Sequence, residues 1–321
     1  MIDKIIINVD ITIDAAVFEN LEERFEDLAA RNKLQRCSAG NTVFYKSTPE
    51  AKTTGLYMQT KGGKLKINCS LHKQFYLRVF GRLDNSGQFT MYNAKWMINN
   101  LFEEIGIEPK NGFIIQYEIG LNIPTDRPPM EYIELIRGIG EKPFYIDAYF
   151  KKNRQKTTDK SRTIRKYFKV YDKGYEMSDR KRKPHDNDPN ILRIETVFRR
   201  EKIKVTEFFS KKHMNKIATQ FIKDWQTIEF EREIRGAKGT RSDQTLRAKQ
   251  IFSMGIEAYM NLINEQRKKG ELSERSYRTA REFARDWNEH KKHFTLIPSE
   301  LEKEYREKLE STFRKMNDVE M

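Results

Sequence analysis

The chain has 321 residues, of which 37% are hydrophobic, 12% aromatic and 34% charged, and its formal net charge is +14. This length predicts one large domain or two smaller ones, and the aromatic content argues against a disordered chain. No apolar run reaches the roughly 18 residues that a membrane span needs, and the first residues do not form a signal peptide. Two cysteines without CxxC spacing argue against a structural zinc site and favour a reducing cytoplasm.

The first two-thirds of the sequence predict strands with a few helices between them. Apolar and polar residues alternate, or β-branched residues cluster, in the segments that we expect to be strands: residues 5–12, 41–45, 55–60, 64–71, 112–123, 144–150, 163–172 and 191–199. Asp14 offers an N-cap for a helix that runs to residue 31, and residues 92–105 predict another helix. This pattern favours an antiparallel sheet flanked by helices.

After about residue 205 the sequence predicts helices alone. Apolar residues at helical spacing indicate one helix from Phe208 to Trp225 and another from a cap at Ser242 to Gly270. Residues 273–290 and 298–316 predict two more helices. The expected fold class is therefore α+β, with an antiparallel sheet domain over residues 1–205 and an all-α module over residues 206–321.

The positive charge is concentrated in one short part of the chain. Residues 151–183 carry 14 basic and 4 acidic side chains, whereas residues 1–150 carry 18 basic and 19 acidic ones. A field of that sign attracts a polyanion, and nucleic acid is the polyanion that this pattern indicates. The alternative is a solvated basic loop with no ligand.

Two carboxylates lie in strands that otherwise look buried. Glu118 lies in an isoleucine-rich segment, with Asn122 four residues later on the same face, and Glu195 lies in a second such segment. A buried carboxylate must be paired or must bind a cation, and two that face each other favour a divalent metal. The alternative is that each one pairs with an arginine such as Arg193 or Arg165.

The segment FKVYDKGYEM, residues 168–177, places two tyrosines beside this basic run. A free phenol is ionised in only about one molecule in a thousand at neutral pH, so a nucleophilic Tyr171 needs a cation or a metal-polarised acceptor nearby. Lys173 would face the same way two residues further along an extended strand, and Tyr175 recurs at a spacing of four. The alternative is that both tyrosines are packing residues.

Several short motifs resemble one family. In order along the chain they are MID at 1–3, KINCSLHK at 66–73, QYE at 116–118, YDKGYE at 171–176 and LRIE at 192–195. The last two resemble the Y-x-K-x-x-E and L-V-R-F-E segments of rolling-circle replication initiators from filamentous phages and from small plasmids of the replication initiation factor family. Glu118 stands where that family has an aspartate in an R-I-D-like setting. The resemblance covers roughly residues 1–205.

The resemblance implies a nuclease-like catalytic domain and assigns roles to its residues. Tyr171 would be the nucleophile and Lys173 a cation for the transition state, while Glu118 and Glu195 would be metal ligands or acid–base groups. Tyr175 would be a second nucleophile, or else a packing residue.

A divalent metal, Mg²⁺ or Mn²⁺, is the cofactor that an acid-rich site of this kind implies. The sequence departs from related endonucleases because it has no His-hydrophobe-His motif. His72, expected at the end of a strand, is then the best candidate for an imidazole ligand, and a structural role for it is the alternative.

The family reaction is the nicking of one strand of origin DNA, single-stranded or extruded, with a 5′-phosphotyrosyl link and a 3′-hydroxyl that primes synthesis. It implies a host helicase and DNA polymerase as partners, no membrane, and a plasmid- or phage-encoded protein in the bacterial cytoplasm. The basic side chains expected to bind DNA are Lys151, Lys152, Arg154, Lys156, Arg162, Arg165, Lys166, Lys169 and Arg193.

Two alternatives remain open from sequence: a mobilisation relaxase with the same chemistry, and a non-enzymatic DNA-binding regulator. The C-terminal helices have arginines on one face, namely Arg275, Arg278, Arg281 and Arg285, with acidic residues close by. This face favours a salt-bridged surface over a DNA contact. The module itself is consistent with origin recognition, with binding of a helicase, or with dimerisation.

Overall fold

The computed structural model describes residues 1–11, 26, 29–30, 34–40, 42–61, 63–147, 154–179 and 190–317. The helix expected after Asp14, the basic residues Lys151 and Lys152, and the end of the basic run beyond residue 179 lie outside these residues. The contacts divide the chain into two compact units. One is Met1–Glu229 together with the chain from Glu304 onward, and the other is Phe230–Lys303. The division into a catalytic domain over residues 1–205 and a module over residues 206–321 stays a prediction.

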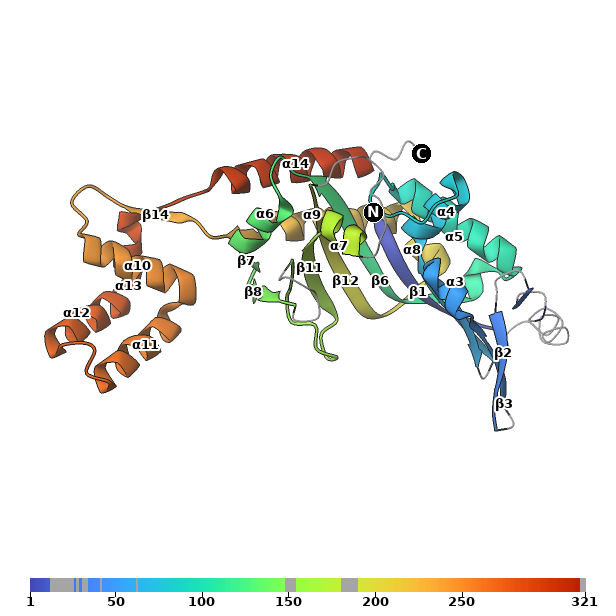
Figure 1. Cartoon of the computed structure of the whole chain (residues 1–321), viewed down its shortest axis with the longest axis horizontal. Coiled ribbons are helices and arrows are strands. Elements are labelled where there is room, and N and C mark those ends of the chain that lie inside the picture. Colours follow the sequence, from blue (N-terminus) through green and yellow to red (C-terminus); the bar gives the residue numbers. More distant parts are fainter. Residues whose placement is uncertain are drawn as a thin grey trace. The chain divides into compact units, whose positions relative to one another are not determined.

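A twisted antiparallel sheet forms the centre of the first unit (Figure 1). Within the described part of the chain it has ten strands, in the spatial order β2 (Leu34–Ala39), β3 (Thr42–Ser47), β4 (Leu56–Lys61), β5 (Lys64–Ser70), β1 (Ile2–Asp10), β6 (Gly112–Pro124), β12 (Ile191–Lys204), β11 (Lys166–Asp172), β10 (Gln155–Thr157) and β9 (Tyr145–Ile146). All neighbouring strands pair antiparallel. The predicted α+β class is confirmed.

The strands form where the sequence alternates or is continuously apolar. Ile5, Ile7 and Val9 of β1 are fully buried, and the residues between them are half-buried, as a period of two requires. The central strands β6 and β12 are buried on both faces over most of their length. A strand buried on both faces reads as a continuous apolar run, so a charged residue within it needs a partner.

Helices pack against this sheet and determine which part of its surface stays open. They are α3 (Pro49–Thr53), α4 (Leu71–Phe80), α5 (Met91–Ile105), α6 (Pro129–Leu135), α7 (Lys173–Asp179), α8 (Val205–Phe208), α9 (Lys211–Gln226) and α14 (Glu300–Asn317), the last of which begins in the second unit. A small sheet of β13 (Ile228–Phe230), β7 (Ile136–Ile139) and β8 (Lys142–Pro143) and a 3-10 turn at Pro109–Asn111 complete the elements.

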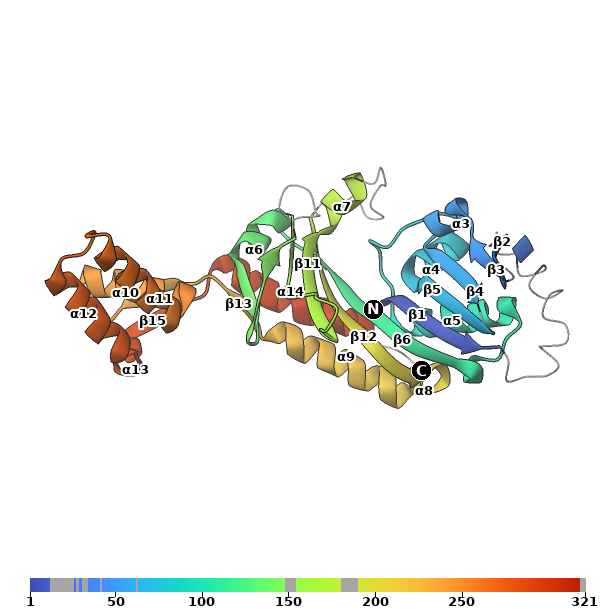
Figure 2. The same ribbon diagram turned by 90° about the horizontal axis from the view of Figure 1, so that it is seen from below.

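Helix α9 runs along the sheet and covers one face of β12 and β11 (Figure 2). The indole nitrogen of Trp225 donates a hydrogen bond of 3.0 Å to the hydroxyl of Thr196, and the Phe168 ring lies edge-on to the indole with centroids 5.7 Å apart. Because side chains alternate along a strand, Glu195 and Lys169 point to the opposite face. The polar face of the central strands is therefore the one that α9 leaves open.

Among the described residues, the predicted helices lie where they were expected, but some of them differ in length. The helix expected from Phe208 to Trp225 is two helices, because Ser210 caps α9 by accepting a hydrogen bond from the backbone amide of His213. The expectation that His72 ends a strand is wrong. Strand β5 stops at Ser70, and His72 lies in the first turn of α4, buried among the residues that this helix packs inward.

The second unit packs its own small core. Its elements are β14 (Glu233–Gly236), α10 (Ser242–Met254), α11 (Ile256–Lys268), α12 (Glu274–Arg285), α13 (Trp287–His290), a 3-10 turn at Lys291–His293 and β15 (Phe294–Ile297). Ile251, Tyr259 and Phe283 are among the buried residues that hold these helices together. The helix predicted from Ser242 to Gly270 is broken at Gly255, whose φ of +84° favours glycine. Strands β14 and β15 also pair, so this part is not purely helical.

In the first unit, no helix that the structure describes has both the length and the apolar composition of a membrane span, and the same is true of the described helices of the second.

Replacing Thr196 by Val should lower the free energy of unfolding of the first unit by about 1–3 kcal/mol, because the buried indole N–H of Trp225 loses its acceptor. Urea unfolding followed by circular dichroism measures this. The double variant Thr196→Val with Trp225→Phe removes the orphaned donor and is the control. If the coupling between the two substitutions were zero, the hydrogen bond would have no part in holding α9 to β12.

Candidate active site

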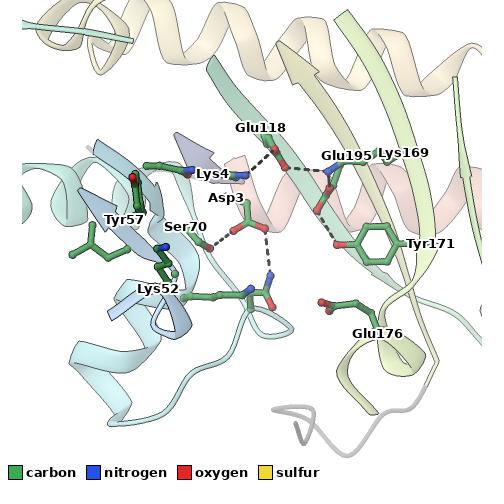
Figure 3. Close-up of a pocket in the computed structure, with 15 residues that line it drawn as sticks. Asp3, Lys4, Lys52, Tyr57, Ser70, Glu118, Lys169, Tyr171, Glu176 and Glu195 are labelled. Atoms are coloured by element: carbon green, nitrogen blue, oxygen red, sulfur yellow. Dashed lines mark hydrogen bonds and ion pairs between the residues drawn. The ribbon is translucent and has the colours of Figure 1, made fainter. Parts of the chain in front are cut away.

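A pocket of about 370 Å³ opens on the polar face of the central strands (Figure 3). The charged residues that line it, within the described chain, are the acids Asp3, Glu118, Glu176 and Glu195 and the lysines Lys4, Lys52, Lys73 and Lys169. Tyr57, Asn85 and Tyr171 also line it. The pocket therefore combines anionic and cationic walls with one buried tyrosine.

The strand register brings the site residues together. Lys169 on β11 lies opposite Glu195 on β12, and Tyr171 lies opposite Arg193. Arg193 in turn lies opposite Asn122 on β6. Residues opposite each other in an antiparallel pair have side chains on the same face, a few ångströms apart. The predicted strands at 163–172, 191–199 and 112–123 thus place these side chains in one patch.

Arg193 is the centre of this patch. Its guanidinium donates to Asp3 Oδ2 at 2.6 Å, to Asn122 Oδ1 at 2.8 Å and to Glu195 Oε1 at 2.9 Å. The side chain is 2% exposed, and burial lowers its pKa while Asp3 and Glu195 raise it above the usual value. It lies across Gly120, because a Cβ there would stand 2.4 Å from its Nη2 atom. Arg193 is thus engaged inside the protein and is not presented at an outer surface.

Tyr171 points into the same patch. Its hydroxyl donates a hydrogen bond of 2.9 Å to Glu195 Oε1, the oxygen that Arg193 also contacts. Burial and then the neighbouring Glu195 charge raise the pKa of the phenol well above 10. The ring is 8% exposed and lines the pocket. At neutral pH this tyrosine is therefore a neutral phenol that donates its hydrogen bond to the Glu195 carboxylate.

Lys169 lies between the two glutamates. Its Nζ atom is 3.0 Å from Glu118 Oε2 and 2.5 Å from Glu195 Oε2, and Lys4 approaches the other oxygen of Glu118 at 3.9 Å. Burial would lower the pKa of Lys169, but Glu195 and Glu118 raise it above its usual range. Burial likewise opposes ionisation of Glu195, whose pKa nevertheless falls to about 2 beside Lys169 and Arg193. Lys169 and Glu195 are therefore both charged, and their opposite charges offset each other.

Lys173 does not continue the strand, which corrects the sequence expectation. It is the first residue of α7, and its ammonium contacts Glu176 Oε2 at 2.6 Å and Asn85 Oδ1 at 2.8 Å. Burial lowers its pKa. Its Nζ atom lies 5.9 Å from the centre of the Tyr171 ring, beside the face of the ring rather than at the hydroxyl. Lys173 thus ties α7 to the loop at Asn85.

Tyr175 lies on the outer side of α7. Its backbone amide donates to Asp172 Oδ1 at 2.9 Å, and the guanidinium of Arg154 stacks on its ring at 4.6 Å. Arg154 also pairs with Asp172 at 2.6 Å. Tyr175 is half-buried and is not among the residues that line the pocket.

The donor set as arranged does not fit a divalent metal. No group of three histidine, cysteine or acidic side chains capable of holding an ion occurs among the described residues. The Lys169 ammonium already lies between Glu118 and Glu195. His72 stacks on Phe89 at 4.5 Å, is kept neutral by burial, which lowers its pKa, and does not line the pocket. The structure therefore does not bring His72 to the two glutamates.

The basic residues expected to bind DNA lie in different surroundings. Arg162 and Arg165 are exposed, and Lys166 pairs with Asp224 at 2.5 Å. Lys156 is buried, and its ammonium donates to the carbonyls of Glu134 and Ile136. Lys156 is thus a packing residue, which corrects its expected role at a DNA-binding surface.

The sequence analysis assigned no role to several residues of the pocket. Asp3, within the MID motif, accepts from Ser70 at 2.8 Å as well as from Arg193. Its signal was a charge at the start of a strongly apolar strand. Lys73 lies in the KINCSLHK motif but had no role assigned, and Lys52 and Tyr57 gave no signal. Asn122, which was singled out, donates to the carbonyl of Ser86 at 2.6 Å and so holds the loop that carries Asn85.

The Gly120→Ala variant should lose about 1–3 kcal/mol of unfolding free energy, because the new methyl group overlaps the Arg193 guanidinium. Chemical denaturation measures the loss. In an Arg193→Gln background, where the shorter side chain leaves that space, the same substitution should cost less. Equal costs in both backgrounds would contradict the proposed clash.

The stability of the first unit should fall at acid pH. The folded Glu195 has a pKa of about 2 against an ordinary 4.5, so its contribution is complete above about pH 4.5 and is lost as the pH falls towards 2. Glu195→Gln should flatten this slope in urea titrations from pH 6 to pH 3. An unaltered slope in Glu195→Gln would contradict this account.

No protein-family model matches the sequence, and no curated protein matches it. The solved structure of the rolling circle replication initiator protein from Geobacillus stearothermophilus is similar to this chain. The match covers 79% of this chain and 96% of that one, with a TM-score of 0.40 and 11% sequence identity.

Proposed function

We propose that this protein nicks one strand of DNA by transesterification at Tyr171, as a rolling-circle replication initiator does. The observation that carries the proposal is the hydrogen bond from the Tyr171 hydroxyl to Glu195 at the wall of an open, charged pocket. A phenol with a raised pKa needs a base within reach to become a nucleophile, and Glu195 is within hydrogen-bonding distance. The YDKGYE and LRIE motifs contain these two residues.

The chemistry follows from the positions of these atoms. The Tyr171 oxygen attacks the scissile phosphorus and forms an O–P bond while the bond from phosphorus to the 3′ oxygen breaks. The phenolic proton passes to Glu195 Oε1, the departing 3′ oxygen takes a proton from water to become a hydroxyl, and Glu195 returns its proton to the solvent. Because Lys169 and Arg193 hold the pKa of Glu195 far below that of the phenol, proton transfer accompanies bond formation instead of preceding it. Arg193, on the same oxygen, holds the carboxylate in place.

Lysines that line the pocket supply positive charge for the phosphate. They include Lys4, Lys52 and Lys73, and the Lys52 ammonium lies 5.4 Å from the centre of the Tyr57 ring (Figure 3). Cations fixed near a phosphoryl group stabilise the charge that develops during transfer. A base can stack on the half-buried Tyr57 ring beside these cations. The pocket suits a single nucleic-acid strand better than a duplex, because a volume of about 370 Å³ admits one nucleotide at a time.

Outside the pocket the DNA would follow the exposed part of the basic segment. Arg162 and Arg165 are at the surface there, and we expect binding to weaken steeply with salt. The substrate is origin DNA, single-stranded or extruded, and the 3′-hydroxyl primes a host polymerase. The resemblance implies Mg²⁺ or Mn²⁺ as the cofactor, so nicking is to be compared with and without either ion. A mobilisation relaxase would use the same chemistry at a transfer origin.

Incubation with the supercoiled replicon from which the gene derives should give a covalent protein–DNA adduct on a denaturing gel, with and without Mg²⁺ or Mn²⁺. Tyr171→Phe should abolish the adduct, because the attacking oxygen is gone. Glu195→Gln should reduce it at least about 100-fold, since the base is lost. Tyr175→Phe should still form it, because that ring lies outside the pocket.

The matched control is Tyr132→Phe, which removes a buried hydroxyl that bonds Glu304 far along the chain from these motifs. Binding of single-stranded DNA by fluorescence anisotropy should be unchanged in Tyr171→Phe. Unaltered DNA binding together with no adduct from the unmodified protein under any metal would instead support a non-enzymatic DNA-binding regulator.

A further inference from the structure

Every oxygen of the two glutamates in the pocket already has a basic side chain beside it. Glu118 Oε1 faces Lys4 at 3.9 Å, and Glu118 Oε2 faces Lys169 at 3.0 Å. Glu195 Oε1 accepts from Arg193, and Glu195 Oε2 faces Lys169 at 2.5 Å. Lys169 is the only one of these cations, among the described residues, that contacts both carboxylates.

We infer that the ammonium of Lys169 occupies the cation position of this site, so that a divalent ion can bind between Glu118 and Glu195 only when Lys169 leaves it. Two carboxylates on adjacent strands repel each other unless a cation lies between them, and either an ammonium or a metal ion answers that need. They cannot do so together, because Mg²⁺ needs the same oxygens at about 2.0–2.1 Å.

The pairing around Lys169 favours the ammonium in the free protein. Its side chain is 18% exposed, so a phosphate that enters the pocket can reach it. The register of β11 places Lys169 opposite Glu195, and the two glutamates themselves hold its ammonium in position. A hydrated Mg²⁺ would have to lose waters and also displace this ion pair. The inference rests on the proposed function and deepens it. In that reaction Glu195 is the base for Tyr171, and Lys169 is the cation that contacts both Glu195 and Glu118.

The position of Lys169 has a test that does not depend on nicking. Mn²⁺ binding by isothermal titration calorimetry should be at least about tenfold tighter in Lys169→Met than in the unmodified protein, because Glu118 Oε2 and Glu195 Oε2 then lose the cation between them. Adding Glu195→Gln to Lys169→Met should abolish the gain. Lys169→Arg, which keeps the charge, should bind Mn²⁺ no better than the unmodified protein.

Lys4→Met is the matched control, because Lys4 contacts only Glu118 and at a longer distance. It should change Mn²⁺ affinity far less than Lys169→Met does. If Lys169→Met fails to fold, the unmodified protein and Glu195→Gln still give an answer. They should bind Mn²⁺ equally weakly, since the pocket offers no open carboxylate in either.

Two results would overturn the inference. One is tight Mn²⁺ binding by the unmodified protein that Glu195→Gln removes, and the other is no gain in folded Lys169→Met. Failure of the nicking proposal has a different signature. The Mn²⁺ results would stand as expected, while the unmodified protein formed no DNA adduct.

Discussion

The Arg193 guanidinium is the interaction on which the rest of the site depends. It joins Asp3 on β1, Asn122 on β6 and Glu195 on β12, three strands that are neighbours in space and far apart in sequence. A buried guanidinium is stable only when its donors are satisfied, and each of these partners is itself buried. The strands therefore settle in one register, and that register sets where Tyr171 and Lys169 point.

Charge buried in this way opposes folding, and the opposite face of the same strands offsets the cost. On that face Trp225 and Phe221 of α9 are fully buried, as are Ile119 and Ile194 beneath them. Burial of aromatic and branched side chains supplies the dominant favourable term in folding. The sheet thus has an apolar face for stability and a polar face for chemistry, divided by the two-residue period of its strands.

The sequence predicts the sheet better than it predicts the site. Strands β5 and β6 lie within one residue of their expected bounds, because alternation and isoleucine-rich runs are local signals. Strand β1 begins three residues earlier than expected, and β12 ends five residues later. The contact between Asp3 and Arg193 spans 190 residues, so no spacing could reveal it. Lys173 was misplaced because β11 reads as a strand to its end. The signal against that reading was Asp172, a helix-capping residue type whose side chain accepts from the amide of Tyr175.

The position of Tyr171 within the sheet has a consequence for turnover. Strand β11 is paired on both sides, with β12 and with β10, so its backbone cannot swing as a loop would. On the proposed chemistry a DNA end joined to this ring would be attached to a strand that is hydrogen-bonded on both sides. The released 3′ end would then have to return to the phosphotyrosyl link. The rate of rejoining would therefore depend on motion of the DNA and not on motion of the enzyme.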